Sequence, residues 1–513
     1  LLSLLLVGGL RFAIRLVAEN QSVLVPLSSA RLKQVLIVGA GDAGALVVRE
    51  LQRNPQLHQV PVGFLDDDKS KLRQQIYGIP VVGELKDLST VLDTERVDEV
   101  VIAIPSAPGK VVRLVADVCR LKGIPFKTMP GIYELLGGEV NVSRLRDVEI
   151  TDLLRRDPAR VKEERMGETV AGKVVLVTGA GGSIGRELCR QIARMEPSEL
   201  VMLGHGENSI FEAVLELRDD YPALRVSPVI ADIRDKERLQ QVFANYHPKV
   251  VFHTAAHKHV PLMEMRINVF EAVTNNILGT RNVVEVAEEY DTERLVMIST
   301  DKAIRPVNVY GATKRIAEMI VLNAGKGSNR AFCVVRFGNV LGSRGSVVPI
   351  FKRQIAKGGP ITITHPDMQR YFMTIPEAVY LVLQSASMGQ GGDAFVLNMG
   401  QQIKIVDLAR DLIRLSGLDT RDIEIVFTGI RPGEKLSEDL WDEGHQFKPT
   451  IHPDIFQHET NENLYNHALN AAVDRLVLLA QEGKTDEIVH LLDEIIPCSS
   501  VSDAPIPEIT AIT

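Results

Sequence analysis

The sequence predicts an α/β protein with two doubly wound parallel sheets. A glycine-rich loop twice follows an apolar strand pattern, first in KQVLIVGAGDAG from Lys33 and again in GKVVLVTGAGGSIG from Gly172. Helical periodicity resumes directly after each loop, and strands that alternate with helices are typical of parallel sheets. The length of 513 residues exceeds what one hydrophobic core usually supports, which favours at least two domains.

Composition and charge narrow the possible partners. Hydrophobic residues make up 45% of the chain and charged residues 24%, as is ordinary for a globular protein. The net charge of −8 does not suggest the basic surface of a nucleic-acid binder, so no nucleic-acid partner is expected. The four cysteines lie far apart without CxxC spacing, so we predict neither a metal site nor a disulfide framework.

The first residues, LLSLLLVGGLRFAIRL, suggest a membrane-associated helix. The apolar run from Leu1 to Leu10 is too short to cross about 30 Å of hydrocarbon by itself. We interpret residues 1–20 as the remnant of a transmembrane or interfacial helix, with a stray amphipathic helix as the alternative. Arg11 and Arg15 would then place the following domains on the cytoplasmic face of the inner (plasma) membrane. The chain is thus expected to be a soluble part of a membrane-anchored protein.

The first glycine loop predicts an N-terminal Rossmann-like domain over residues 31–140. Its glycines, Gly39, Gly41 and Gly44, have GxGxxG spacing, and the next strand ends in Asp66 to Asp68, about 20 residues further on, where a ribose-binding acid would stand. No catalytic pair follows, so nucleotide binding and an empty docking domain both stay open. The charged residues 141–170 are predicted to form a linker with short helices.

The second glycine loop is the stronger sign of a bound dinucleotide. In TGxxGxxG the glycines let the backbone turn and approach a pyrophosphate, and the following helix directs its N-terminus at that charge. The next strand ends in Gly204 instead of an acid that would bind the ribose of NAD, so NADP and NAD both stay open. The residues predicted to hold the cofactor are Gly179, Gly182, Ser183, Ile184, Gly185, Asp232, Ile233, Ala255 and Ala256.

The stretch STDKAIRPVNVYGATK, residues 299–314, carries two acid–base pairs. Tyr310 and Lys314 lie four apart, so a helix would place them on one face. An adjacent ammonium lowers the pKa of a phenol, which makes Tyr310 a candidate base for a hydroxyl while Lys314 also holds the nicotinamide ribose. Asp301 and Lys302 stand just upstream as an additional acid and base.

At these residues the sequence resembles the extended short-chain dehydrogenase/reductase superfamily, and within it the nucleotide-sugar 4,6-dehydratases of bacterial polysaccharide biosynthesis. The resemblance covers roughly residues 170–445 and includes TGAGGSIG, AAHKHVPLME, STDKAIRPVNVYGATK, RFGNVLGSRGSVVPIF, MQRYFMT and RPGEKL. The remaining parts resemble the long, membrane-anchored branch of UDP-N-acetylglucosamine 4,6-dehydratases. Some long members carry Met where this chain has Tyr310.

The resemblance implies a three-step reaction on a UDP-sugar. Oxidation at carbon 4 acidifies the hydrogen on carbon 5, and elimination of water across carbons 5 and 6 then needs a base and an acid. Hydride return to carbon 6 regenerates a tightly bound NADP or NAD. The implied catalytic residues are Thr300, Asp301 (acid), Lys302 (base), Tyr310 and Lys314. We expect burial and neighbouring cations to keep Lys302 neutral, and desolvation to keep Asp301 protonated.

The resemblance also implies a substrate-binding set and a small C-terminal substrate lobe. Arg370 and Arg431 are predicted to bind the diphosphate, because a guanidinium offers a planar charged fork to phosphate oxygens. Glu434 is expected to accept hydrogen bonds from ribose hydroxyls. The full predicted set is Lys258, His259, Asn339, Arg344, Ser346, Arg370, Arg431 and Glu434.

The predicted domain order continues from the linker with a catalytic domain and substrate lobe over residues 171–445. Peripheral helices are expected over 446–495 and a disordered tail over 496–513, where Pro, Ser and small residues dominate. The resemblance further implies a homo-oligomer.

Two other functions stay open. A UDP-sugar 4-epimerase needs Tyr310, Lys314 and the cofactor but no base at carbon 5, so Lys302 discriminates between the two enzymes. A non-catalytic NADP-sensing scaffold protein would need neither pair. Retention or inversion at carbon 5 is not indicated by any residue.

Overall fold

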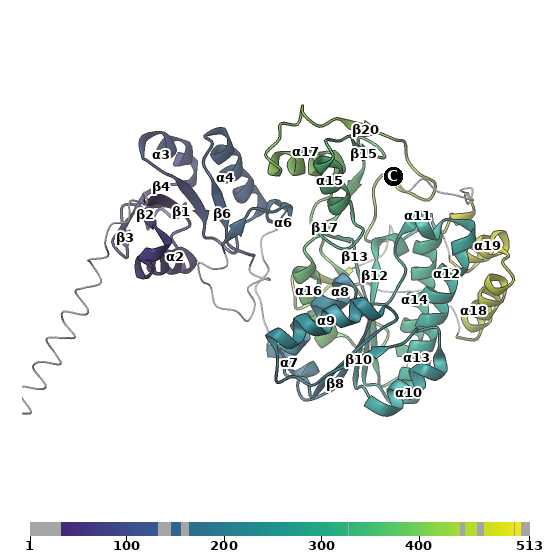
Figure 1. Cartoon of the computed structure of the whole chain (residues 1–513). Coiled ribbons are helices and arrows are strands. Elements are labelled where there is room, and N and C mark those ends of the chain that lie inside the picture. The colour runs from purple at the N-terminus through teal and green to yellow at the C-terminus, as the bar shows by residue number, and fades with distance from the viewer. Residues whose placement is uncertain are drawn as a thin grey trace, which may run out of the picture. The chain divides into compact units, whose positions relative to one another are not determined.

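The computed structural model describes residues 32–131, 145–154, 164–326, 328–441, 447–458, 466–496 and 498–503 (Figure 1). These residues form two compact units, one over 32–105, 114–130 and 145–147 and the other over the rest. The predicted helix over residues 1–20 lies outside the described residues, so membrane attachment stays a prediction. Within the described ranges, no helix is both long and apolar enough to cross a membrane.

The first unit is a doubly wound sheet of seven strands in the order β3-β4-β2-β1-β5-β6-β7. The strands are β1 (Lys33–Val38), β2 (Gln59–Leu65), β3 (Gln75–Ile76), β4 (Ile79–Gly83), β5 (Glu99–Ile102), β6 (Phe126–Thr128) and β7 (Arg146–Asp147). Helix α2 (Asp42–Arg53) lies on one face, and α3 (Leu88–Thr94) and α4 (Gly109–Leu121) lie on the other (Figure 1). The Rossmann-like fold predicted for this part is confirmed.

The linker predicted over residues 141–170 begins too early. β7 pairs antiparallel with β6 and so belongs to the first sheet. A two-residue strand is too short to leave a pattern in the sequence. The short helices α6 (Ile150–Leu153) and α7 (Glu164–Val170) follow it.

The second unit is built on a sheet of nine strands in the order β10-β9-β8-β11-β12-β13-β18-β22-β21. The strands are β8 (Val174–Thr178), β9 (Glu199–Gly204), β10 (Val226–Ile230), β11 (Val250–His253), β12 (Arg294–Thr300), β13 (Ala331–Phe337), β18 (Ala394–Leu397), β21 (Phe447–Pro449) and β22 (Ile455–His458). The seven strands from β10 to β18 are parallel. The strand order reverses between β8 and β11, and ligands of such sheets bind where the order reverses.

Helices cover both faces of this sheet (Figure 1). One layer holds α7, α8 (Ser183–Ala193), α9 (Glu207–Asp220) and α16 (Ile375–Met388). The other holds α10 (Lys236–Tyr246), α12 (Val269–Val273), α13 (Gly279–Glu289) and α14 (Val309–Gly325). The short helix α11 (Val260–Met263) precedes α12, and a π-helical turn, η6 (Thr274–Leu278), joins α12 to α13.

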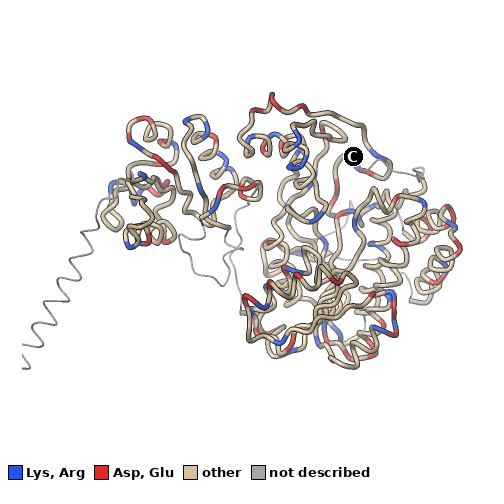
Figure 2. The backbone as a smooth tube through the Cα atoms, in the orientation of Figure 1, with Lys and Arg blue, Asp and Glu red and all other residues tan. Residues whose placement is uncertain are grey.

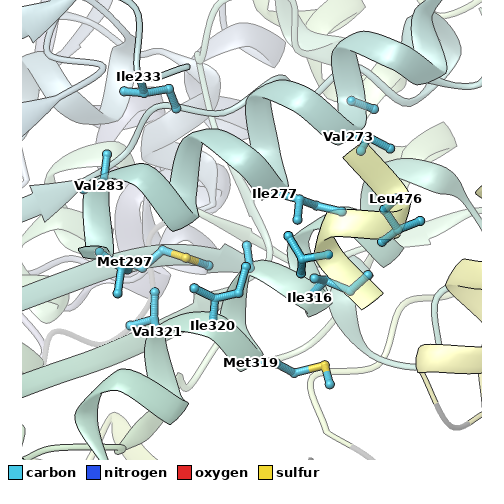
Figure 3. Close-up of a cluster of buried hydrophobic side chains, with 14 of the residues drawn as sticks. Ile233, Val273, Ile277, Val283, Met297, Ile316, Met319, Ile320, Val321 and Leu476 are labelled. Atoms are coloured by element: carbon cyan, nitrogen blue, oxygen red, sulfur yellow. The ribbon is translucent and has the colours of Figure 1, made fainter. Parts of the chain in front are cut away.

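The strands are apolar on both sides because each face packs against a helix layer. In β12, Leu295 and Met297 belong to the core under α10, α12, α13 and α14, which we call the first core. Val296 and Ile298 belong to the core under α7, α8, α9 and α16, as the two-residue period of a strand requires. Figure 3 shows Met297 in the first core together with side chains from α13 and α14. The buried strand ends therefore hold the loops of the site rigidly.

A small lobe, as predicted, is built from segments that lie between strands of the main sheet in the chain. It contains α15 (Val347–Ala356), α17 (Ile405–Leu415) and three two-stranded sheets. The pairs are β14 (Asn339–Val340) with β17 (Phe372–Met373), β15 (Ile361–Ile363) with β20 (Ile425–Phe427), and β16 (Gln369–Arg370) with β19 (Ile403–Lys404).

The expectation of only peripheral helices over residues 446–495 is wrong. β22 pairs antiparallel with β18 and β21 pairs antiparallel with β22, so both extend the main sheet, although their short segments contain Pro and His and lack a clear strand pattern. α18 (Asn466–Gln481) and α19 (Thr485–Ile495) do follow, but Leu476 and Leu492 are fully buried in the first core. The tail predicted from residue 496 also begins too early, because Val501 in the short helix η8 (Val501–Asp503) is buried.

Charged residues are mixed along both units. Figure 2 shows Lys and Arg interspersed with Asp and Glu over the described chain, in keeping with the small net charge of −8.

Candidate active site

The glycine loop after β8 has the geometry of a pyrophosphate site. Gly179 has φ +69°, and a Cβ there would lie 2.8 Å from the backbone nitrogen of Ala255. A Cβ on Gly185 would lie 2.3 Å from the Gly179 carbonyl oxygen, so the turn has no room for a side chain. Gly182 precedes the first residue of α8 and supplies no side-chain cap, which leaves the N–H groups of that turn available to an anion. These residues fit a dinucleotide cofactor.

The loop after β11 meets the glycine loop at the strand-order reversal. His253, at the end of β11, bridges the hydroxyls of Thr178 (2.8 Å) and Thr280 (3.0 Å) and so joins two strands and a helix. Burial and the charge of Lys314 lower the pKa of His253 to about 3, so the ring is neutral. His253 was not predicted from the sequence. Ala255 and Ala256 follow it and are half-buried, as close approach to a cofactor requires.

Asp232 and Ile233, both predicted to hold the cofactor, differ in their surroundings. Ile233 is 4% exposed and its side chain packs against Gly279 of α13 in the first core (Figure 3), and its predicted place in the cofactor site stays a prediction. Asp232 is partly exposed, but Arg234 donates to both of its oxygens, and this pairing lowers the pKa of the carboxyl.

The predicted catalytic residues meet where β12 ends. Thr300 caps the short helix η7 (Asp301–Ala303), where its hydroxyl accepts from the Lys302 N–H at 3.4 Å. The same hydroxyl donates to Asp301 Oδ1 at 2.9 Å and hydrogen-bonds the hydroxyl of Tyr310. Lys302 Nζ donates to Asp301 Oδ1 at 3.0 Å. Tyr310, Thr300, Asp301 and Lys302 therefore form one continuous hydrogen-bonded chain.

Lys314 lies behind this chain. Its Nζ donates to the Ile298 carbonyl oxygen at 2.8 Å, and burial lowers its pKa to about 8. Burial raises the pKa of Tyr310 to about 12, while Lys302 and the Thr300 hydrogen bond act in the lowering direction. The expectation that Lys314 lowers the pKa of this phenol is wrong for the protein alone, because Lys302 is the cation that acts on it.

Lys302 lies between two carboxylates. Besides Asp301, the Oε1 atom of Glu438 lies 3.6 Å from its Nζ, and Asn339 Oδ1 accepts from it at 3.4 Å. Burial disfavours the ammonium, but the two carboxylates outweigh burial and the nearby Arg370, and they raise the pKa of Lys302 above its ordinary value. The expectation of a neutral Lys302 is therefore wrong for the protein without substrate.

Two carboxylate oxygens in this cluster have no hydrogen-bond partner within the described chain. They are Oδ2 of Asp301 and Oε2 of Glu438, on side chains that are 0% and 3% exposed. Buried polar atoms are nearly always paired. Both atoms are thus placed to exchange a proton or to meet a substrate group.

Most of the predicted substrate residues lie in two loops. Asn339 contacts the catalytic lysine. Lys258 Nζ lies 3.4 Å from the Ser343 hydroxyl, and the His259 ring packs on Gly345. The backbone of Arg344 donates to the Ser183 hydroxyl beside the glycine loop, and its guanidinium pairs with Glu212 at 3.1 Å. Ser346, next in this loop, has a buried hydroxyl without a partner in the described chain.

The guanidinium of Arg370 donates its hydrogen bonds to backbone carbonyl oxygens of the protein itself. Arg370 is 7% exposed and donates to the carbonyls of Gln369 (2.7 Å), Lys435 (2.8 Å) and Leu436 (3.2 Å). This favours a role in fixing the 435–436 turn over the predicted diphosphate contact.

Arg431 is half-buried, and its backbone N–H approaches Glu434 Oε2 at 3.4 Å. The predicted ligand roles of Arg431 and Glu434 stay predictions.

Sequence reasoning missed two acids. Glu264 accepts from the Val309 N–H (2.7 Å) at the start of α14, and burial raises its pKa to about 7. Glu438 lies four residues after Glu434, the acid that was chosen from the same segment. Glu264 belongs to a segment that carried the resemblance and Glu438 closely follows one, but only tertiary packing reveals their burial.

In the first unit, the acid predicted to bind a ribose is engaged by the protein itself. Asp66 Oδ2 accepts from the Ala40 N–H at 2.7 Å and pairs with Lys71 at 3.2 Å. Gly39 has φ +103°, and a Cβ on Gly44 would lie 2.0 Å from the Gly39 carbonyl oxygen, so this loop is also tightly turned.

Comparison with known families gives a match for each part of the chain. Residues 175–460 match the family described as "Polysaccharide biosynthesis protein". The chain belongs to this family. It is an extended short-chain dehydrogenase/reductase of the nucleotide-sugar dehydratase and epimerase group. Residues 1–130 match a family described as "CoA-binding domain".

Relatives within the family differ in their named activities. The capsular polysaccharide biosynthesis protein CapD of Staphylococcus aureus is 45% identical over 93% of this chain and 78% of its own. A UDP-N-acetylglucosamine 4,6-dehydratase (inverting) of Campylobacter jejuni is 35% identical over 52% of this chain and 76% of its own. A UDP-glucose 4-epimerase of Rickettsia canadensis is 34% identical over 52% of this chain and 77% of its own.

A solved structure, that of Pen from Bacillus thuringiensis, superposes with a TM-score of 0.53. It is 34% identical and covers 57% of this chain and 90% of its own. Identity alone therefore does not separate the dehydratase from the epimerase, and the site residues have to.

Proposed function

We propose that this protein is a UDP-N-acetylglucosamine 4,6-dehydratase that uses NAD or NADP. The product would be a UDP-4-keto-6-deoxy-N-acetylhexosamine for a surface polysaccharide. The observation that carries the proposal is the hydrogen-bonded chain of Tyr310, Thr300, Asp301 and Lys302. It places an oxidation base beside an acid and a second base, which elimination needs and epimerisation does not.

In the oxidation step, Tyr310 accepts the proton of the carbon-4 hydroxyl. A dinucleotide held by Gly179, Gly182 and Gly185 would supply a hydride acceptor for carbon 4 and a hydride donor for carbon 6. Lys314 is fixed by the Ile298 carbonyl oxygen, close behind the end of β12, where it can hold the cofactor ribose. Asn339 supports the substrate side through its contact with Lys302.

In the elimination step, Lys302 removes the proton from carbon 5 and Asp301 protonates the hydroxyl that leaves carbon 6 as water. The two groups are 3.0 Å apart, so the base and the acid can act together on carbons 5 and 6. Lys302 then returns its proton to carbon 5 when hydride reaches carbon 6.

The proton balance gives Thr300 a role of its own. Each turnover leaves one proton on Tyr310, taken from carbon 4, and removes one from Asp301, lost with water. Because the Thr300 hydroxyl contacts both side chains, it offers a direct path that restores them.

The proposal is tested by incubating the protein with UDP-N-acetylglucosamine in deuterated water and examining the product by NMR. A 4-keto-6-deoxy sugar with deuterium at carbon 5 is expected. Formation of UDP-N-acetylgalactosamine alone would instead identify a 4-epimerase, the second candidate that the Rickettsia relative supports. The Lys302→Ala variant should form no dehydrated product, and unchanged turnover would remove Lys302 from its role.

A further inference from the structure

Glu438 is a buried carboxylate for which the proposed mechanism has no use so far. It stands in the segment after β20, and the side-chain amide of Gln402 donates to its backbone carbonyl at 2.7 Å. Its side chain is 3% exposed, and Oε1 lies 3.6 Å from Lys302 Nζ. Oε2 has no hydrogen-bond partner among the described residues. A carboxylate buried in this way is costly unless a partner or a proton neutralises it.

The groups that face Glu438 come from several elements. Asp301 and Lys302 belong to η7, Arg370 to β16, and Lys435 to the same segment as Glu438. Tyr310 of α14 is also within range of its charge. Burial raises the pKa of Glu438, and Asp301 adds to this, while the three cations oppose it. Glu438 is thus a better proton acceptor than an exposed carboxylate.

We propose that Glu438 accepts the proton of the Lys302 ammonium and so frees the amine for carbon 5 while Asp301 keeps its own proton. The inference rests on the proposed dehydratase function and deepens it. Glu438 acts through Lys302, without contact with the sugar, and is therefore a positioning residue. Glu438 would hold the lysine proton during elimination, when Lys302 must be neutral and Asp301 must be protonated.

The transfers balance over a turnover. The N–H bond of Lys302 breaks and an O–H bond forms on Glu438, which turns a buried ion pair into two neutral groups. Lys302 takes the carbon-5 proton, the electron pair of that bond forms the carbon 5–6 double bond, and the hydroxyl leaves with the proton of Asp301. Lys302 then returns a proton to carbon 5 and recovers another from Glu438. Asp301 is restored from Tyr310 through Thr300.

The experiment isolates the lysine step with a UDP-N-acetyl sugar that already lacks the 6-hydroxyl. Such a compound can be oxidised at carbon 4 but cannot lose water, so exchange of its carbon-5 hydrogen with deuterated water measures Lys302 alone. With full-length Glu438→Gln we expect exchange at neutral pH to fall at least tenfold, while formation of the reduced nicotinamide persists.

The pH dependence of carbon-5 exchange shows whether Glu438 accepts a proton or has only a structural role. In the unaltered protein, exchange should decline as the pH falls and Glu438 becomes protonated, and should level off above that. In Glu438→Gln the lysine must lose its proton to solvent, so exchange should keep rising with pH. Glu438→Asp should recover part of the lost exchange, and it serves as the test if Glu438→Gln does not fold.

The matched control is Asp439→Asn, which alters the neighbouring acid that pairs with Arg305 at 2.6 Å on the partly exposed side of the segment. It should leave exchange unchanged. Exchange and a pH profile equal to those of the unaltered protein in Glu438→Gln would overturn the inference. Failure of the unaltered protein to dehydrate UDP-N-acetylglucosamine would instead overturn the proposed function, so the two failures are distinct.

Discussion

Replacement of Thr300 by Val tests whether one hydroxyl joins the two acid–base pairs. Val keeps the branched shape but removes the hydroxyl that accepts from the Lys302 N–H (3.4 Å), donates to Asp301 (2.9 Å) and contacts Tyr310. A lost helix cap costs about 1 kcal/mol and a lost hydrogen bond to a charged group about 1.5–3 kcal/mol. We therefore expect unfolding free energy to fall by roughly 2–4 kcal/mol.

The turnover of folded Thr300→Val should also fall, for a reason separate from its loss of stability. Without the hydroxyl, Asp301 must recover its proton from solvent, and a lost acid–base contribution typically lowers rates by about 10²-fold or more. Denaturant titration measures the first effect, and the rate of 4-keto product formation, under conditions where the variant is folded, measures the second.

Thr300→Ser keeps the hydroxyl and serves as the control, with turnover expected within a few-fold of the unaltered protein. A Thr300→Val variant with near-normal stability and turnover would refute the hydrogen-bonded chain as a working unit.

Three further predictions concern packing and charge. Arg336→Met removes a partner that lies 2.6 Å from fully buried Glu318, and it should lower the unfolding free energy by about 3–5 kcal/mol. The control Lys236→Met removes a surface ion pair and should cost less than about 1 kcal/mol. Denaturant titration measures both effects. Burial opposes ionisation of Glu318, but the arginine partners of Glu318 outweigh burial and lower the pKa of this carboxyl to about 2. The stabilising contribution of Glu318 should therefore be complete above about pH 4.5 and vanish as the pH falls through 2. An acid titration of stability would contradict this if it stayed level over that range. Gly185→Ala should abolish NAD(P) binding measured by calorimetry, because the added Cβ would lie 2.3 Å from a backbone oxygen, while Gly167→Ala in α7 meets no atom within 4 Å and should leave binding intact.

Features set by local spacing were predicted well from the sequence. The glycine loop, Tyr310 and Lys314 on one helix, and the acid–base pair after β12 all follow from residues close together in the chain. The protonation of these groups did not follow, because burial and distant charges decide it. Lys314 was expected to act on Tyr310 and Lys302 to be neutral, yet Lys302 acts on the phenol and is itself held charged by two carboxylates.

Features set by tertiary packing were missed for the same reason. Glu438 reaches Lys302 only because the segment after β20 folds back over the end of β12, and its sequence does not distinguish it from Glu434. The packing of Ile233 against Gly279 was likewise not evident from the sequence, because the two residues lie 46 positions apart in the chain. β21 and β22 were too short to show a strand period.

The fate of the carbon-4 hydrogen tests the central claim most directly. UDP-N-acetylglucosamine carrying deuterium at carbon 4 is incubated with the protein, and the position of the label in any product is read by NMR and mass spectrometry. The dehydratase account predicts deuterium in the carbon-6 methyl group of a 4-keto product, since the hydride taken from carbon 4 returns to carbon 6. Deuterium that stays at carbon 4 of a sugar with its 6-hydroxyl intact would contradict it.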